Sequence, residues 1–405
     1  MENLLGNIID NLPYFTIPFV SAFVGWITNL IAIKMTFYPL KYRGIRPFGW
    51  QGIIPSKARK MAETAVDLWT SKLIDLETQF AKIKPEKVAE EMTPSIDYLS
   101  KEIIDEVMEA KMPRIWRQIP EVIKKNLYED VGKSLPVIVE EMMKDIKRDF
   151  SNMLDLKTLA VSSLTRNKKL LNQMFLKCGE QEFRFIIRSG FYFGFLFGLI
   201  QMLVWYFIPM WWILPVFGIL VGYFTNYLAL QLIFRPLKPI KIGNLSIQGM
   251  FIKRQREVSE EYSRMVASNI ITIESIFEYI IRGPGSTRLR KIVRRQIDKT
   301  INETAGVLRS TLEAYTGSRM FVHIRNIACF RFMQELPMNI RHVFGYAENA
   351  LDLEAILREK MSALSPIEFE AFLRPVFKED ETTLILIGAA LGGIAGLAQY
   401  FIAFS

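Results

Sequence analysis

Two stripes of small and polar residues could do chemistry inside otherwise apolar segments. Gly25, Thr28, Asn29 and Ala32 are three and four residues apart, so they share one face of a helix. Such amides and hydroxyls can bind a solute, an ion or a lipid headgroup, or can hydrogen-bond across a helix contact. An unpartnered Asn in hydrocarbon is costly, so the stripe must face protein or water. The same stripe occurs again at Gly222, Thr225, Asn226 and Ala229.

Two further amides, Gln201 and Gln399, follow runs of glycine at four-residue spacing. That spacing puts the glycines on one helix face, where a neighbouring helix can pack closely. We expect the two amides to pair with each other or with Asn29 and Asn226. The residues predicted to line a substrate or ion path are Thr28, Asn29, Thr225, Asn226, Gln201 and Gln399. The glycines predicted to pack helices together are Gly25, Gly222, Gly190, Gly194, Gly198, Gly388, Gly392 and Gly396.

Basic residues near these segments could bind lipid phosphate. Lys57, Arg59, Arg254 and Arg256 follow Gly-punctuated stretches, and headgroup binding or ordinary anchoring at the membrane surface both explain them. Lys34, at the end of the first apolar segment, is expected to extend to the interface.

Acidic residues oppose this basic trend just before two of the apolar segments. Glu182 and Asp380 are equivalent members of these two groups. We expect them to hold a cation or, as the simpler case, to pair with Lys57 and Arg59.

Four apolar stretches carry or adjoin these residues, at 17–37, 186–208, 213–234 and 382–404. Each is long enough to cross a bilayer, which takes about 20 residues. The chain begins with an acidic rather than a basic segment, so we do not expect a cleavable signal peptide. No Asp or Glu lies inside the four stretches, which disfavours a proton-driven transporter.

Lys and Arg are confined to one side of these spans. Residues 1–16, the turn around Pro209 and the tail after Thr382 contain none. The positive-inside rule therefore predicts that segments 39–185 and 235–381 are cytoplasmic and that both termini lie outside. The net charge of +9 arises in these two segments, so we expect membrane lipids rather than nucleic acid as the basic residues' partner.

The sequence contains an internal duplication. A shift of 197 residues aligns 18–59 with 215–256 without a gap and gives 14 identities. We therefore predict a first repeat over 1–209 and a second over 210–405, each a span, a long segment and a span. Because the first and third spans run in the same direction, the repeats are parallel.

The remaining composition excludes several classes of protein. Two cysteines, Cys178 and Cys329, exclude a disulfide scaffold, and two histidines disfavour a zinc or haem site. No nucleophile–base pair or phosphate loop is found, so we expect neither an enzyme nor a cofactor. The long segments have helical periodicity and predict amphipathic helices.

The stretches GWITNLIAIKMTFYPLK, GYFTNYLALQLIFRPLK and EFRFIIRSGFYFGFLFGLIQ together resemble the YheB/YjiN-like bacterial membrane proteins, the domain of unknown function 445. The G-x-x-T-N-x-x-A motif is the most specific feature, and Gln231 replaces Lys34 in its second copy. The resemblance implies the bacterial cytoplasmic (inner) membrane and supplies no activity.

Taken together, the patterns predict an all-α polytopic membrane protein with four transmembrane helices, two parallel repeats and long amphipathic cytoplasmic helices. The first functional hypothesis is a non-enzymatic protein that binds or translocates a solute, ion or lipid where the repeats meet, with the two Asn stripes face to face. The alternative is a membrane-anchored scaffold whose cytoplasmic helices bind a protein partner or self-associate.

Overall fold

The computed structural model describes residues 2–45, 49–243, 245–305 and 319–403. Contacts divide the chain into two compact units, which are described separately. The first comprises residues 1–73, 161–265 and 357–405, and the second comprises residues 74–160 and 266–356. Each unit therefore draws on both predicted repeats, and the predicted boundary at residues 209 and 210 lies inside the first unit.

Four helices of the first unit are long and apolar enough to cross a membrane. They are α1 (Glu2–Phe37), α11 (Glu180–Phe207), α12 (Ile213–Phe234) and α21 (Pro366–Ala403). Their apolar windows are Tyr14–Phe37, Glu180–Phe207, Ile213–Phe234 and Glu381–Ile402. Most ends of these windows lie within a few residues of the four predicted spans. Residue 404, the predicted end of the last span, lies outside the described part of the chain.

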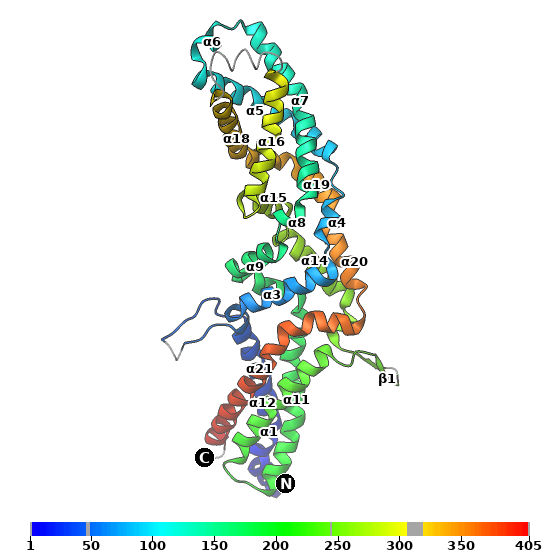
Figure 1. Ribbon diagram of the computed structural model, residues 1–405. Coiled ribbons are helices and arrows are strands. Elements are labelled where there is room, and N and C mark those ends of the chain that lie inside the picture. Colours follow the sequence, from blue (N-terminus) through cyan, green and yellow to red (C-terminus); the bar gives the residue numbers. More distant parts are fainter. Residues whose placement is uncertain (1, 46–48, 244, 306–318, 404–405) are drawn as a thin grey trace. The chain divides into compact units, whose positions relative to one another are not determined.

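The four spans form two close helix pairs. Helix α1 packs along α11, and α12 packs along α21, while α11 also contacts α12 and α1 contacts α21 (Figure 1). Large apolar side chains of these helices are exposed, among them Phe23 of α1, Leu203 of α11 and Ile394 of α21. Exposed apolar faces of this kind are what a helix bundle presents to lipid.

A short hairpin follows the first span of each pair. The peptide bonds Tyr38–Pro39 and Arg235–Pro236 are both cis. After the first of them, Arg43 and Trp50 pair as an isolated antiparallel bridge. After the second, β1 (Ile240–Ile242) pairs with β2 (Leu245–Ile247), and Ile240 faces Ile247 in the register. The two hairpins thus pair at positions that are 197 residues apart.

Shorter helices complete the first unit around a buried aromatic contact. The Trp69 Nε1 donates to the Tyr262 hydroxyl at 2.6 Å, and both side chains are buried. The elements are α2 (Ile53–Ser56), α3 (Ala58–Leu68), the π-helix η1 (Trp69–Leu73), α10 (Lys168–Cys178) and α13 (Met250–Lys253). Three helices extend from one unit into the other in sequence, namely α9 (Leu156–Arg166), α14 (Gln255–Asn269) and α20 (Leu353–Ser362).

The second unit is a helical body with its own apolar core. Helix α5 packs on α7, and α16 and α18 cover them, as Figure 1 shows. Phe80 stacks on Phe150 with ring centroids 4.1 Å apart. Its helices are α4 (Leu76–Phe80), α5 (Pro85–Lys111), α6 (Pro113–Gln118), α7 (Glu121–Arg148), α8 (Phe150–Met153), α15 (Ile273–Arg282), α16 (Ser286–Ala305), α18 (Arg319–Asn339), η2 (Ile340–Val343) and α19 (Phe344–Leu351).

Candidate functional site

Asn29 lies at the closest approach of the first helix pair. Its Nδ2 donates to the Ile186 carbonyl of α11 at 2.7 Å. A Cβ added at Gly190 would lie 2.6 Å from that Nδ2 and 2.3 Å from the Gly25 carbonyl oxygen. Only glycine leaves room for both the amide and the neighbouring backbone. The Thr28 hydroxyl donates to the Gly25 carbonyl of its own helix at 3.1 Å, so this hydroxyl is also engaged within the first pair.

The second helix pair is built in the same way. The Asn226 Nδ2 donates to the Leu384 carbonyl of α21 at 2.9 Å. A Cβ at Gly388 would lie 2.2 Å from this amide nitrogen, and a Cβ at Gly222 would lie 2.1 Å from the Gly388 oxygen. The Thr225 hydroxyl donates to Gly222 of its own helix. The remaining glycines predicted to pack helices, Gly194, Gly198, Gly392 and Gly396, also lie against backbone of the paired helix.

The prediction that the two Asn stripes face each other is wrong. Each amide donates to a backbone carbonyl inside its own pair. Contacts between the pairs are instead apolar and aromatic, such as Phe197 with Phe224, at 6.1 Å between ring centroids. A buried cluster with Ile17, Trp205, Ile213 and Leu214 also joins the four helices, and Tyr400 packs against it. Ridges of small residues give the closest backbone approach, so the stripes serve each pair rather than the junction.

The two glutamines differ in their partners. The Ser21 hydroxyl of α1 donates to the Gln201 Oε1 at 2.7 Å, so this amide also serves the first pair. In the second pair Gly218 stands where Ser21 stands in the first. The Gln399 Nε2 is buried and has no hydrogen-bond partner among the described residues, and the same holds for the Asn29 Oδ1. Both atoms belong to residues of the predicted path and are buried without a partner among the described residues.

The predicted headgroup residues occupy different environments. Arg59 is exposed and pairs with Glu63 at 3.0 Å. Lys57 is partly exposed and has an interaction within the chain, and Arg256 is exposed. The side chain of Arg254 is 18% exposed, and its guanidinium pairs with the carboxylates of Glu182 and Glu257.

Glu182 forms a buried ion pair with Arg254. Its fully buried carboxylate accepts from Arg254 Nη1 at 2.8 and 2.9 Å. The Arg254 Nε also donates to Glu257 at 2.8 Å. Burial alone lowers the pKa of Arg254, but the hydrogen bonds to Glu257 and Glu182 prevail and raise it. Glu182 was expected to pair with Lys57 or Arg59, and it is Arg254 that it contacts; the side chain of Asp380 lies outside the described part.

An open pocket of about 430 Å³ lies at the end of the first span. Its basic groups are Lys34 and Arg43, and Tyr38 and Trp50 supply aromatic walls. The Trp50 Nε1 donates to the Met35 carbonyl at 3.3 Å, which ties the hairpin to the last turns of α1. Sequence reasoning found Lys34 but missed the other three residues, because the pairing of Arg43 with Trp50 is not visible in a charge pattern. The aromatic and basic run FYPLKYR was the available signal.

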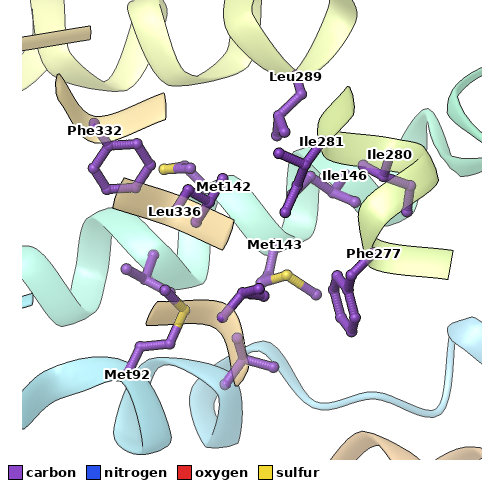
Figure 2. A pocket seen from close by; sticks show the side chains of 13 residues that line it. Met92, Met142, Met143, Ile146, Phe277, Ile280, Ile281, Leu289, Phe332 and Leu336 are labelled. Carbon is purple, nitrogen blue, oxygen red and sulfur yellow. The ribbon is translucent and has the colours of Figure 1, made fainter. Parts of the chain in front are cut away.

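The second unit contains an apolar cavity of about 40 Å³. Figure 2 shows its lining, which includes Met92, Met143, Phe277 and Leu336. All of its lining residues are apolar, so it offers no group for acid–base chemistry or for holding an anion. A cavity this small is a gap in a packed core, since apolar cavities that take up benzene are near 150 Å³.

Metal and thiol chemistry find little support in the described residues. Within these ranges no three His, Cys, Asp or Glu side chains cluster as metal ligands. Cys178 is buried, and burial raises the pKa of its thiol to about 12. A thiol with so high a pKa is almost entirely protonated at neutral pH and is a poor nucleophile.

The fold and these sites define a multi-pass helical membrane protein. The chain is 25% identical over 203 residues to a UPF0754 membrane protein of Bacillus mycoides, covering 44% of this chain and 53% of that one. A UPF0754 membrane protein of Bacillus cereus is 26% identical over the same shares of the two chains. Another from that species is 31% identical over 101 residues, covering 24% of this chain and 26% of its own.

The chain thus spans about half the length of the first two relatives and about a quarter of the third. No protein-family model and no solved structure matches it. The chain is therefore similar over part of its length to membrane proteins of Bacillus. The narrower family named from the sequence motifs stays a prediction.

Proposed function

We propose that the protein is a non-enzymatic, membrane-anchored scaffold. In this proposal the four spans are a fixed anchor made of two parallel repeats, and the long helical segments lie in the cytoplasm. These segments bind a protein partner or a second copy of the chain. The proposal takes up the alternative that the sequence left open and places translocation of a solute or ion second.

The observation that carries the proposal is the use of the intramembrane polar groups. Asn29 and Asn226 each bind a backbone carbonyl of the neighbouring helix, and Gln201 accepts from Ser21. A pathway for a solute needs polar groups that are free to exchange protein contacts for solute contacts. Here the same groups stabilise helix packing, and the contacts between the pairs are apolar.

The second unit adds the surface that a scaffold requires. Among the described residues of α5, α7 and α18, the side chains of Tyr98, Val122 and Phe330 are 66%, 70% and 68% exposed. Exposed aromatic and aliphatic side chains are common at the centre of protein interfaces. The small apolar cavity of the same unit belongs to its packed core and offers no site for a polar substrate.

Site-specific photo-crosslinking in living cells tests the scaffold. A photoreactive amino acid replaces Tyr98, Val122 or Phe330 in the full chain, and Lys101, an exposed polar position, is the control. We expect discrete adducts from the apolar positions and none from the control. An adduct of twice the chain mass identifies a second copy as the partner. If normally inserted protein forms no adduct at any of the three apolar positions, the scaffold proposal is wrong.

A further inference from the structure

The open pocket at the end of α1 is lined by apolar and basic residues of the span and of the hairpin that follows it. Ile31 and Met35 belong to the last turns of the first span and form part of the lining. Lys34 and Arg43 lie beside them, on the span and on the hairpin. An acyl chain and a phosphate need these two environments next to each other, whereas free phosphate in water has no use for the apolar lining.

The two cationic groups of the pocket have no carboxylate partner in the part of the chain that the structure describes. Within the described residues neither Lys34 nor Arg43 forms an ion pair, and both side chains are exposed. Six other basic side chains of this unit are neutralised at short distance. They are Arg59 by Glu63, Arg184 by Glu180, Arg235 and Arg374 by Glu370, Arg254 by Glu182, and Lys72 by Glu368.

Two aromatic residues line the pocket at the end of the first span, where we expect the membrane surface. The Trp50 indole N–H is used by the Met35 carbonyl, so its ring forms a fixed wall. The hairpin is closed by two backbone hydrogen bonds between Arg43 and Trp50, at 2.9 and 2.7 Å. Tyr38 is 53% exposed and lines the same pocket. Trp and Tyr are enriched at this depth because one end of each side chain is apolar and the other is polar.

We propose that this pocket binds one anionic phospholipid, with its phosphate between Lys34 and Arg43 and its acyl chain against Ile31 and Met35. Arg supplies a planar set of donors for phosphate oxygens, and Lys supplies a compact charge. A headgroup with its own cation is disfavoured, because that cation would meet the two basic side chains.

The second hairpin has a similar backbone but lacks the basic and aromatic side chains that line the pocket. Gln231, Ile240 and Ile247 stand at the positions of Lys34, Arg43 and Trp50. Arg235 replaces Tyr38, and Glu370 neutralises it at 3.5 Å. The second hairpin therefore lacks both cations at the positions of Lys34 and Arg43 in the sequence and serves as an internal control.

Native mass spectrometry of the purified full chain in detergent tests the site. The protein is titrated with phosphatidylglycerol and with phosphatidylcholine of the same acyl chains. We expect the first lipid to bind preferentially, and the double variant Lys34→Gln with Arg43→Ile to bind it about tenfold or more weakly. The matched control, Lys238→Gln with Lys241→Gln, removes the same charge from the second hairpin and leaves the affinity unchanged.

Three results would overturn the proposal: equal binding of the two lipids, an equal loss of affinity in the matched control, or equally effective competition by soluble glycerol phosphate. The last result would assign the site to a soluble phosphate instead. The single variants Lys34→Gln and Lys34→Arg guard against misfolding, since the first weakens binding and the second retains it in a monodisperse protein. The lipid site and the scaffold are independent, so failure here leaves the crosslinking test untouched.

Discussion

The hairpin that follows α1 and the hairpin that follows α12 share a backbone frame and differ in the positions of their charged residues. In both, a glutamine side chain donates to the leucine carbonyl eleven residues earlier, Gln51 to Leu40 and Gln248 to Leu237. In both, a glycine donates to the carbonyl of the proline that ends the span. The first hairpin then presents Arg43 and Trp50, where the second presents two isoleucines.

The helix pairs below the hairpins show the same division. Asn29 and Asn226 make equivalent hydrogen bonds across equivalent glycines, whereas the surrounding groups diverge. Ser21 donates to Gln201 in the first pair. In the second pair the equivalent residue is Gly218, which has no side chain to donate to Gln399. The comparison teaches that close packing requires particular residues at a few points, while neighbouring positions remain available for a specific ligand.

The strongest test of this comparison asks whether the two pairs are independent. Glu182 of α11 forms a buried ion pair with Arg254, which follows the hairpin after α12, so this contact links the first pair to the segment that continues the second. Arg254→Ala leaves the carboxylate buried and uncompensated, so we expect a loss of about 3–5 kcal/mol of stability. Thermal unfolding in detergent, monitored by size-exclusion chromatography, measures this loss.

The control for that variant is an exposed pair of the same unit. Lys72 and Glu368 are 49% and 44% exposed, so Lys72→Ala should cost at most about 1 kcal/mol. If Arg254→Ala is as mild as Lys72→Ala, the pairs do not depend on this link and are independent modules.

A second test addresses the shared frame itself. Gly190→Val and Gly388→Val each push a side chain into backbone or into an amide of the paired helix. We expect both to destabilise by similar amounts, about 1–3 kcal/mol or more. Unequal losses would show that the two close approaches are not equivalent. Gly345→Ala is the control, because a Cβ there meets nothing within 4 Å, and alanine in a helix is neutral or stabilising.

The positions of the spans could be predicted from the sequence, but the partners of their polar residues could not. Hydropathy and length are local properties, and they located all four spans. Helical spacing correctly placed Gly25 and Asn29 on one face, yet it does not say which of three neighbouring helices that face meets. For the same reason Glu182 was matched with basic residues of its own half of the chain, although it contacts Arg254. The pocket was missed because Lys34 and Arg43 line it together only after the hairpin folds back, and the sequence does not show the pairing of Arg43 with Trp50.

A third test separates packing from translocation. Asn29→Leu and Asn226→Leu each remove one hydrogen bond inside a helix pair, which costs about 0.6–1.7 kcal/mol in a membrane. The loss should be smaller for Asn29, because its buried Oδ1 has no partner among the described residues and leucine removes that penalty. Unfolding midpoints of the two variants measure the difference. Unchanged stability in both, together with loss of a cellular phenotype, would favour a solute path instead.

The smallest expected effect is a gain of binding at the second hairpin. Gln231→Lys with Ile240→Arg places on that frame the two cations of the first hairpin. We expect a second phosphatidylglycerol molecule to bind per chain, more weakly than the first, because Ile247 provides no aromatic wall where Trp50 does. Native mass spectrometry at rising lipid concentration counts the bound molecules.

The outcome of this graft distinguishes charge from shape. If no second lipid binds, adding Ile247→Trp restores the aromatic wall at the paired position of the register. Binding only in the triple variant would show that the ring positions the lipid and that the cations alone are insufficient. Absence of a second lipid even then would mean that the shared backbone does not bring the two hairpins to equivalent positions at the membrane surface. The comparison between the hairpins would then extend to their hydrogen bonds but not to their function.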